Sequence, residues 1–423
     1  MINKRWGFAA TAAVAAGILL VGCSGSSTPS ESEATSDEPV TLTYWDFLDP
    51  SQDNPRAKAL KDNIAGFEAA NPNISVELAV VSLGDMLSRL PQAAAAGQAP
   101  DVFKMFTPTV PQMAAAGAYS PLPSAASEID DWLRPADNLV GPDGAQVAVP
   151  YEYRTCAFYY NEKILAEIGA SVPTTYDEVV EVAGKAAAAG YAGFGTGFSD
   201  TDNSAVISTF FDCFMSQVDQ EIWNEDGEAD FATKKGEEFG NFLADLRDVG
   251  GLPTSVVSDS YGTVSDGLLN GTVAMSVLGT ERIVTYATQN PDLKWAPLPL
   301  ASTGDETGTT IGWTMGIGAG SKHVDAAWKF IEYMTGAEAG TNLATGGEVP
   351  TRASTYEEAF FSTPEADTVN SIAEYVESNS EPHGYSDNWI GLATGLSHAG
   401  QELFLNGLSG SEFIKSAQDA ANQ

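Results

Sequence analysis

The sequence predicts an α/β protein with two lobes, and three observations lead to this expectation. Segments with the two-residue period of strands alternate with segments whose apolar residues recur at the spacing of helices. This alternation begins at residue 40 and restarts near residue 146. After the first 38 residues, about 385 remain. That length exceeds what one small core needs and suits two lobes.

The first set of elements reads strand, helix, strand, helix, strand. The strands are expected at 40–45, 74–80 and 102–105, and the helices at 56–70 and 85–97. In the first helix Leu60, Ile64 and Phe67 fall on one face, and Asn71-Pro72-Asn73 ends it. This order favours βαβ units and a mostly parallel sheet.

A second set of elements follows, with strands expected at 146–150, 156–160 and 273–278 and helices at 176–189, 239–249 and 326–334. Thr175 and Glu178 have the spacing of a capping box, in which each satisfies a free backbone donor of the other. No short period repeats along the chain, which disfavours a solenoid or propeller.

The N-terminus has the pattern of an export signal. Lys4 and Arg5 precede an apolar run over 6–21 that is too short and too rich in Ala and Gly for a comfortable membrane span. The run ends in Leu-Val-Gly-Cys23, which resembles the lipobox of bacterial lipoproteins and implies acylation of Cys23. The alternative is an ordinary signal peptide with Cys23 nearby.

We therefore expect a signal peptide over 1–22 and a lipidated Cys23 followed by a flexible tether through residue 38. Residues 24–38 contain no large apolar side chain, so they cannot bury enough surface to offset the entropy of ordering. A diacylglyceryl cysteine supplies the two acyl chains that stable anchoring needs.

Charge and cysteine content narrow the partners further. The formal net charge is −37 at pH 7, which disfavours nucleic acid as a partner. Outside the leader only Cys156 and Cys213 remain. In an oxidising exterior they form either a disulfide or two separately buried thiols, and the sequence leaves both alternatives open.

A set of segments, taken in order, resembles a known family from residue 40 almost to the end. They are LTYWDF, IAGFEAANPNISVEL, AAAAGQAPDVFKM, AAAGAYSPL, VAVPYEYRTCAFYYNEKILAEIGASVPTTYDEV, WNEDGEADF, LLNGTVAMSVLG, KWAPLPL and DAAWKFIEYMTGAEAG. Together they resemble family 1 extracellular solute-binding proteins, the maltose-binding-protein-like group that serves bacterial ABC sugar importers.

This resemblance implies a two-lobed, periplasmic-binding-protein-like fold of type II, with discontinuous lobes and a three-segment hinge. We place the crossovers near 150–156, 272–279 and 310–317. The N-terminal lobe is then 39–152 with 273–312, and the C-terminal lobe is 153–272 with 313–423. The resemblance also implies a monomer, lipid-anchored on the extracellular face of the cell membrane, that delivers a carbohydrate, expected to be an oligosaccharide, to an ABC permease.

A sugar offers apolar ring faces and a rim of hydroxyls, so its site combines aromatic planes with polar side chains. Candidates follow strand ends, where α/β sheets bind ligands, or fall at the expected crossovers and near the C-terminal helices. For the aromatic candidates the alternative is core packing; for Arg154 it is an ion pair with Glu152 or another acid, and for Glu281 a surface salt bridge. The predicted ligand-binding residues are Trp45, Asp49, Phe106, Tyr151, Tyr153, Arg154, Glu281, Trp313 and Trp389.

Enzyme signatures are missing from the sequence. There is no GxSxG, P-loop or HExxH, and His323, His383 and His398 lack metal-ligand spacing. We expect no catalytic residues, no metal and no cofactor. Three alternatives stay open: a secreted glycoside hydrolase with a carboxylate pair, a binder of a peptide or polyamine, and an adhesion or scaffold lipoprotein.

Overall fold

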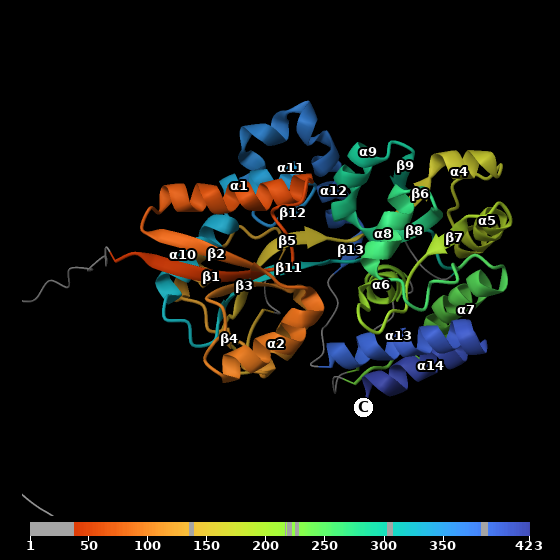
Figure 1. Cartoon of the computed structure of the whole chain (residues 1–423), viewed down its shortest axis with the longest axis horizontal. Helices are drawn as coiled ribbons and strands as arrows, with labels where there is room; N and C mark the ends of the chain where they lie inside the picture. Colours follow the sequence, from red (N-terminus) through yellow and green to blue (C-terminus); the bar gives the residue numbers. More distant parts are fainter. Residues whose placement is uncertain are drawn as a thin grey trace, which may run out of the picture. The chain divides into compact units, whose positions relative to one another are not determined.

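Two main sheets contain most of the strands that the alternating pattern predicts (Figure 1). The structure is a computed structural model, and it describes residues 38–134, 139–215, 217, 222–224, 228–302, 308–381 and 388–423. The predicted signal peptide, Cys23 and the tether before residue 38 lie outside the described residues. Residues 39–423 form one compact unit.

The larger sheet has seven strands in the order β12-β5-β11-β3-β1-β2, with β4 beside β11. Its strands are β1 (Val40–Asp46), β2 (Ile74–Val80), β3 (Val102–Phe106), β4 (Tyr119–Ser120), β5 (Ala148–Arg154), β11 (Ile311–Gly318) and β12 (Val349–Pro350). β1 runs parallel to β2 and β3, whereas β11 runs antiparallel to β3, β4 and β5.

The second sheet has four strands in the order β7-β8-β6-β9. They are β6 (Cys156–Asn161), β7 (Ala192–Gly195), β8 (Val273–Gly279) and β9 (Leu293–Ala296), and a separate pair joins β10 (Gly308–Thr309) to β13 (Ser380–Glu381). β6 is antiparallel to both of its neighbours. The sheets are therefore mixed, and the expectation of mostly parallel strands is wrong, because β6 and β11 enter their sheets directly from a crossover.

Helices connect and cover the strands, and several begin at the predicted signals. They are α1 (Pro55–Ala70), α2 (Leu83–Ala95), α3 (Val110–Ala115), α4 (Glu162–Glu167), α5 (Tyr176–Ala188), α6 (Ser204–Ile207), α7 (Lys234–Asp248), α8 (Tyr261–Leu269), α9 (Ile283–Gln289), α10 (Val324–Met334), α11 (Ala337–Thr345), α12 (Asp367–Ser378), α13 (Trp389–Asn406) and α14 (Gly410–Ala421). None of the helices in the described ranges is long and apolar enough to cross a membrane.

The predicted capping box at the start of α5 forms in part. The Thr175 hydroxyl accepts a hydrogen bond from the Glu178 backbone N–H, as expected. The Glu178 carboxylate, however, accepts from the N–H and hydroxyl of Thr174 instead of closing the box on Thr175. The first turn is thus capped one residue further out than the motif predicts.

The chain passes between the sheets three times, and two of these passages are single residues. β5 ends at Arg154 and β6 begins at Cys156, so Thr155 is the first crossover; Thr310 separates β10 from β11 in the same way. Both lie within expected crossover regions. The third passage falls between β12 and β13.

The expected crossover at 272–279 is absent from the structure, because β8 lies wholly in the second sheet with all seven residues buried. β8 and β9 both belong to that sheet, and β11 belongs to the first. The sheets therefore do not follow the expected lobe division, in which 273–312 joined the N-terminal lobe and 313–423 the C-terminal lobe.

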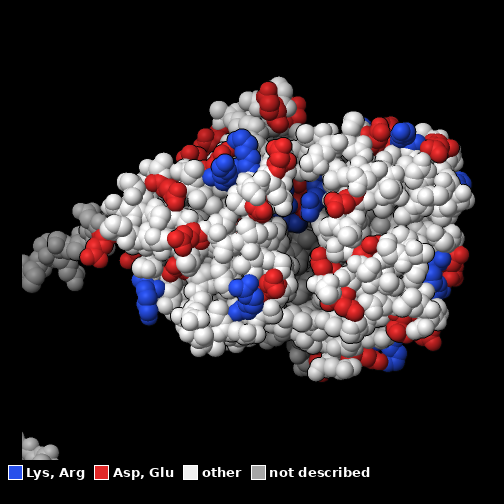
Figure 2. All heavy atoms as spheres, viewed as in Figure 1, with Lys and Arg blue, Asp and Glu red and all other residues white. Residues whose placement is uncertain are grey.

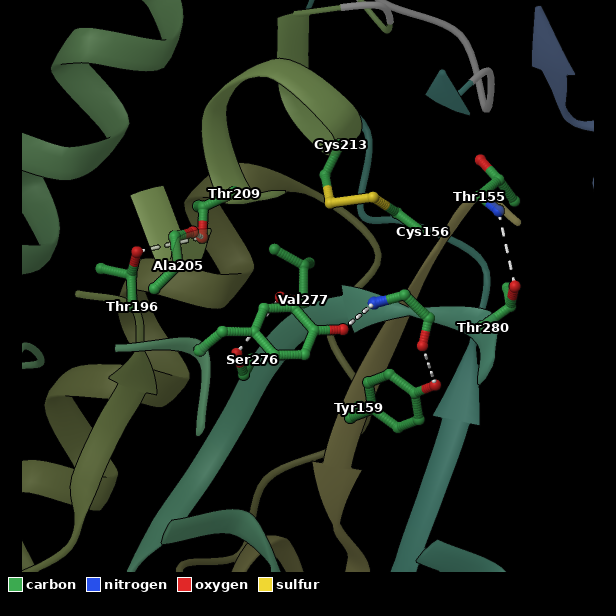
Figure 3. The surroundings of a disulfide bond; sticks show 12 residues. Thr155, Cys156, Tyr159, Thr196, Ala205, Thr209, Cys213, Ser276, Val277 and Thr280 are labelled. Carbon is green, nitrogen blue, oxygen red and sulfur yellow. Dashed lines mark hydrogen bonds between the residues drawn. A yellow bond between two sulfur atoms is a disulfide. The ribbon is translucent and has the colours of Figure 1, made fainter. Parts of the chain in front are cut away.

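A disulfide sits beside the first crossover. Cys156, the first residue of β6, is bonded to Cys213 on the π-helical segment Ser208–Met215, with the two Cα atoms 5.4 Å apart (Figure 3). Thr155 and Thr280 lie next to it and exchange hydrogen bonds: the Thr280 N–H donates to the Thr155 carbonyl at 2.9 Å, and the Thr155 N–H donates to the Thr280 hydroxyl. Of the two alternatives, the structure has the disulfide.

Replacing both cysteines, as Cys156→Ala with Cys213→Ala, should lower the free energy of unfolding by about 2–4 kcal/mol, since the bond closes a long loop in the unfolded chain. Urea unfolding of the soluble chain measures this change. Reductant should move the wild-type midpoint toward that of the variant and leave the variant unchanged. A wild-type midpoint that ignores reductant would show that the bond contributes nothing.

Candidate functional site

One edge of the seven-stranded sheet collects side chains from four strands. β1, β3 and β5 all end there, and β11, which runs the opposite way, begins there. Trp313 is opposite Phe106 on one side and Glu152 on the other. The register of β11 against β5 shifts just after Trp313, and such bulges change the direction of side chains near functional sites. Figure 2 shows a hollow near the middle of the surface, with atoms of basic and acidic residues beside it.

Four rings from distant parts of the chain pack together at this edge, and we call them the aromatic group: Phe47, Phe106, Trp313 and Trp389. The Trp313 ring stacks on Phe47 with centroids 4.1 Å apart and lies 5.5 Å from Phe106. Trp389, the first residue of α13, meets Phe106 edge-on at 6.0 Å. The structure thus unites three of the predicted residues.

These rings are buried against one another, although exposed planes were expected. Trp313 is 6% exposed, Phe106 8% and Trp389 3%. Sequence reasoning missed Phe47. It lies two positions beyond Trp45, and a search for aromatic residues just past the strand end would have found it.

A second set of side chains, the charged group, lies beside the rings. It comprises Asp46, Arg56, Lys104, Glu152, Arg154, Glu281, Arg282 and Glu348. Arg154 is ion-paired with Glu152, and its Nη1 also lies 3.1 Å from Glu281 Oε1 in a second ion pair. The alternative weighed for Arg154, an ion pair with Glu152 or another acid, is what the structure has.

The remaining ion pairs tie the charged group to the rings. Arg56 donates from Nε and Nη2 to Glu348 Oε1 at 3.0 and 2.8 Å. Lys104 Nζ is 3.5 Å from Asp46 Oδ1 and 4.4 Å from the centroid of the Phe47 ring. A buried cation against ring faces is a stabilising arrangement, so the two groups form one unit.

Tyr151 also belongs beside this unit, because Lys104 Nζ lies 4.7 Å from the centre of its ring. Burial, followed by the nearby Glu348 and Asp46 carboxylates, holds the pKa of Tyr151 well above its usual value. Its hydroxyl therefore stays protonated.

The other predicted residues have different neighbours. Trp45 packs toward α2, where the Arg89 guanidinium lies 5.2 Å from the centre of its ring. Asp49 accepts a hydrogen bond from the Ser51 N–H at 2.8 Å in the loop after β1. The Tyr153 hydroxyl donates to the Arg134 carbonyl at 3.2 Å. Their part in ligand binding remains a prediction.

Burial and neighbouring charges give three carboxyls of the charged group different pKa values. For Glu152, loss of solvation is the largest effect and raises the pKa to about 7, despite the attraction of Arg154. For Glu281, burial acts in the same sense, but Arg154, Arg282 and the Tyr261 hydroxyl together lower the pKa. For Glu348, Arg56 and Lys104 outweigh burial and lower the pKa to about 2. Glu152 is therefore the acid of this set that titrates near neutrality.

No set of three or more His, Cys, Asp or Glu side chains in the described ranges is arranged to hold a metal ion. The polar chemistry of the site therefore consists of carboxylates, guanidinium groups and an ammonium group set against rings. Such a combination can bind a ligand with apolar faces and hydroxyls.

Comparison with known proteins gives one family match and several structural matches. The model of the family described as "Bacterial extracellular solute-binding protein" matches residues 52–341, more than half of the chain. A maltotriose-binding protein of Pyrococcus abyssi is 26% identical over 278 residues, which are 62% of this chain and 56% of that protein. The chain spans less than two thirds of the length of the curated relatives that it matches.

Two solved structures share the fold over most of the chain. The GacH receptor of Streptomyces glaucescens, solved unliganded and with acarbose, has a TM-score of 0.76 at 22% identity, covering 90% of this chain and 97% of that one. Maltose-bound MalE3 of T. maritima has a TM-score of 0.77 at 20% identity, covering 90% and 99%. Both support the expected two-lobed binding-protein fold.

The raised pKa of Glu152 gives a pH-dependent contribution to stability. Between pH 4.5 and about 7 the folded chain retains a proton that the unfolded chain releases, so this group lowers stability as pH rises through that window. The variant Glu152→Gln lacks the titration. Its melting temperature relative to wild type should therefore increase from pH 5 to pH 8.

Thermal melts of both proteins across this range measure the difference. Glu77→Gln, the same chemical change at an exposed position of β2, is the matched control. Parallel curves for wild type and Glu152→Gln would contradict the prediction.

Proposed function

Because the chain belongs to the bacterial extracellular solute-binding protein family, we propose that it captures a carbohydrate outside the cell and delivers it to an ABC permease. The observation that carries this proposal is the aromatic group beside the charged group, at the edge where the chain passes between its sheets. The ligands of similar proteins, namely maltotriose, acarbose and maltose, support the ligand class.

The geometry explains how capture would work. Trp313 and Phe106 belong to the seven-stranded sheet, whereas Trp389 opens α13, which packs against α6, α7 and α14. A sugar entering between these rings replaces ring–ring contact with ring–sugar contact on both sides. Only such differential contact can shift the population toward a ligand-closed state. Since the rings are buried, binding requires the seven-stranded sheet, which bears Trp313 and Phe106, to separate first from α13, which bears Trp389.

The ligand contacts that we propose are the four rings of the aromatic group together with Arg154 and Glu281. Rings stack on the apolar faces of a sugar, and the polar side chains bind its hydroxyls. Tyr151 would support the rings through Lys104. Trp45, Asp49 and Tyr153 would act further from the centre, in longer ligands.

For attachment to the cell, we propose diacylglyceryl modification of Cys23 after removal of residues 1–22, with the following residues as a tether. Two acyl chains give stable anchoring where one chain gives only marginal binding. An acidic chain is repelled by anionic lipid headgroups, which makes a covalent anchor useful. The protein would act as a monomer on the outer face of the cell membrane.

The alternative of a glycoside hydrolase has to use a carboxylate pair with one protonated and one ionised member. Glu152 and Glu281 have such a split in pKa. Both, however, are ion-paired to the same guanidinium of Arg154, and that pairing would have to break before either could act on a glycosidic bond. A non-catalytic binder therefore fits better, and release of reducing sugar by purified protein would contradict it.

A thermal-shift screen of mono- and oligosaccharides on the chain from residue 24 tests carbohydrate binding. At about 100 times the dissociation constant, a ligand should stabilise the protein by about 2.7 kcal/mol. Trp313→Ala should weaken any hit by at least about tenfold, because it removes the stacking ring. Trp295→Ala, in β9 of the other sheet, is the matched control and should bind as wild type does. A melt moved by peptides or polyamines, and by no carbohydrate, would reject the ligand class.

The anchor is tested in cells that export the full chain. Wild type should be found in the membrane fraction with an increase in mass on its N-terminal peptide, whereas Cys23→Ser should lack that mass and appear in the medium. A Cys156→Ala and Cys213→Ala double variant should remain with the membrane. Retention of Cys23→Ser on the membrane would contradict lipid attachment at this residue.

A further inference from the structure

The charge around Arg154 is balanced before any ligand binds. Its guanidinium is paired with Glu152 and with Glu281, and Arg282 Nε lies 3.4 Å from the same Glu281 oxygen. Glu281 Oε1 also accepts a hydrogen bond from the Tyr261 hydroxyl at 2.9 Å. Arg154 by itself is typical of an anion site, but this arrangement leaves it no charge for a ligand carboxylate.

The other cations of the charged group are balanced in the same way. Arg56 is paired with Glu348 and Lys104 with Asp46. The group therefore contains four acids and four cations, and each cation lies within 4 Å of an acid. An added anion would meet the acids without a free cation to offset them.

Five buried polar atoms of the aromatic and charged groups lack a hydrogen-bond partner among the described residues. Two are acceptors, Glu152 Oε2 and Glu281 Oε2, and three are donors, Arg154 Nε, Arg282 Nε and Trp313 Nε1. Glu152 is 1% exposed, Glu281 2% and Arg154 8%. Buried polar groups are nearly always paired. The unpaired atoms therefore indicate which chemical groups of a ligand would pair with them once the site opens.

Of the hydroxyl, carboxylate and ammonium groups that a sugar or a charged solute offers, the hydroxyl alone satisfies both kinds of atom. A hydroxyl donates to a carboxylate oxygen and accepts from an N–H. A carboxylate accepts only, and would face Glu152 and Glu281 across a site that excludes water. An ammonium group donates only, which leaves Arg154 Nε and Trp313 Nε1 unpaired.

We infer that the polar end of the site selects an uncharged pair of hydroxyls, so that the ligand is a neutral carbohydrate and sugars carrying carboxylates are refused. Glu152 and Glu281 are the residues that determine this specificity. The inference rests on the proposed carbohydrate ligand and adds that this ligand is uncharged.

The test compares maltotriose, cellotriose and mannotriose with the same sugars after oxidation of their primary hydroxyls to carboxylates. Isothermal titration calorimetry on the chain from residue 24 gives each dissociation constant at pH 7.5. At least one neutral sugar should bind, and its oxidised form should bind at least about tenfold more weakly. Glu281→Gln, which removes one buried negative charge, should reduce the ratio of the dissociation constant of the oxidised sugar to that of the neutral sugar.

Glu152→Gln is a second variant for the case in which Glu281→Gln does not fold, as judged by its thermal melt. Exposed Glu77→Gln is the matched control and should keep the wild-type ratio. If an oxidised sugar binds as tightly as its neutral form, the inference about charge is overturned while the carbohydrate proposal stands. If no carbohydrate binds but a peptide or polyamine does, both are overturned.

Discussion

The ion pairs of Arg154 are the constraint on which the rest of the site depends. Arg154 ends β5 in one sheet, and its partner Glu281 lies two residues after the end of β8 in the other. A buried charge left without its partner is strongly destabilising. The two strand ends are therefore fixed relative to each other, and the backbone hydrogen bond between Thr155 and Thr280 holds the same junction. The rings and remaining charges are arranged around this fixed point.

Lys104 connects this junction to the aromatic group. Its ammonium lies within 6 Å of the centres of the Phe47, Tyr151 and Trp313 rings and close to Asp46. The Arg154 guanidinium lies 5.8 Å from the centre of the Trp313 ring as well. Ring positions and charge positions are thus coupled, so a ligand that moves Trp313 changes the surroundings of both cations. Stacking and polar recognition in this site are not separable.

The local helices and strands and several residues of the site could be predicted from the sequence, whereas the long-range arrangement of these parts could not. Apolar periodicity placed β1, β2 and α1. Phe106 was predicted from its place after a strand, Trp313 from an expected crossover and Trp389 from its place near the C-terminal helices. The strand β8 was predicted at its observed place, but the lobe assigned to it came from the family resemblance, and a fully buried strand has no alternation that assigns it to a sheet. The antiparallel course of β11 and the pairing of Arg56 with Glu348 join positions far apart in the chain. No local pattern predicts such contacts, and the burial that raises the pKa of Glu152 depends on them.

The order of strands in the two sheets sets different conditions for their assembly as the chain is synthesised. The four-stranded sheet is built from one continuous stretch, from Cys156 to Ala296. The larger sheet cannot close in that way, because β11 must insert between β3 and β5 after some 150 intervening residues have emerged. Until then β3 and β5 have open edges, which are the parts of a nascent chain most prone to wrong pairing. The first half of the polypeptide is therefore the one that depends most on protection before the chain is complete.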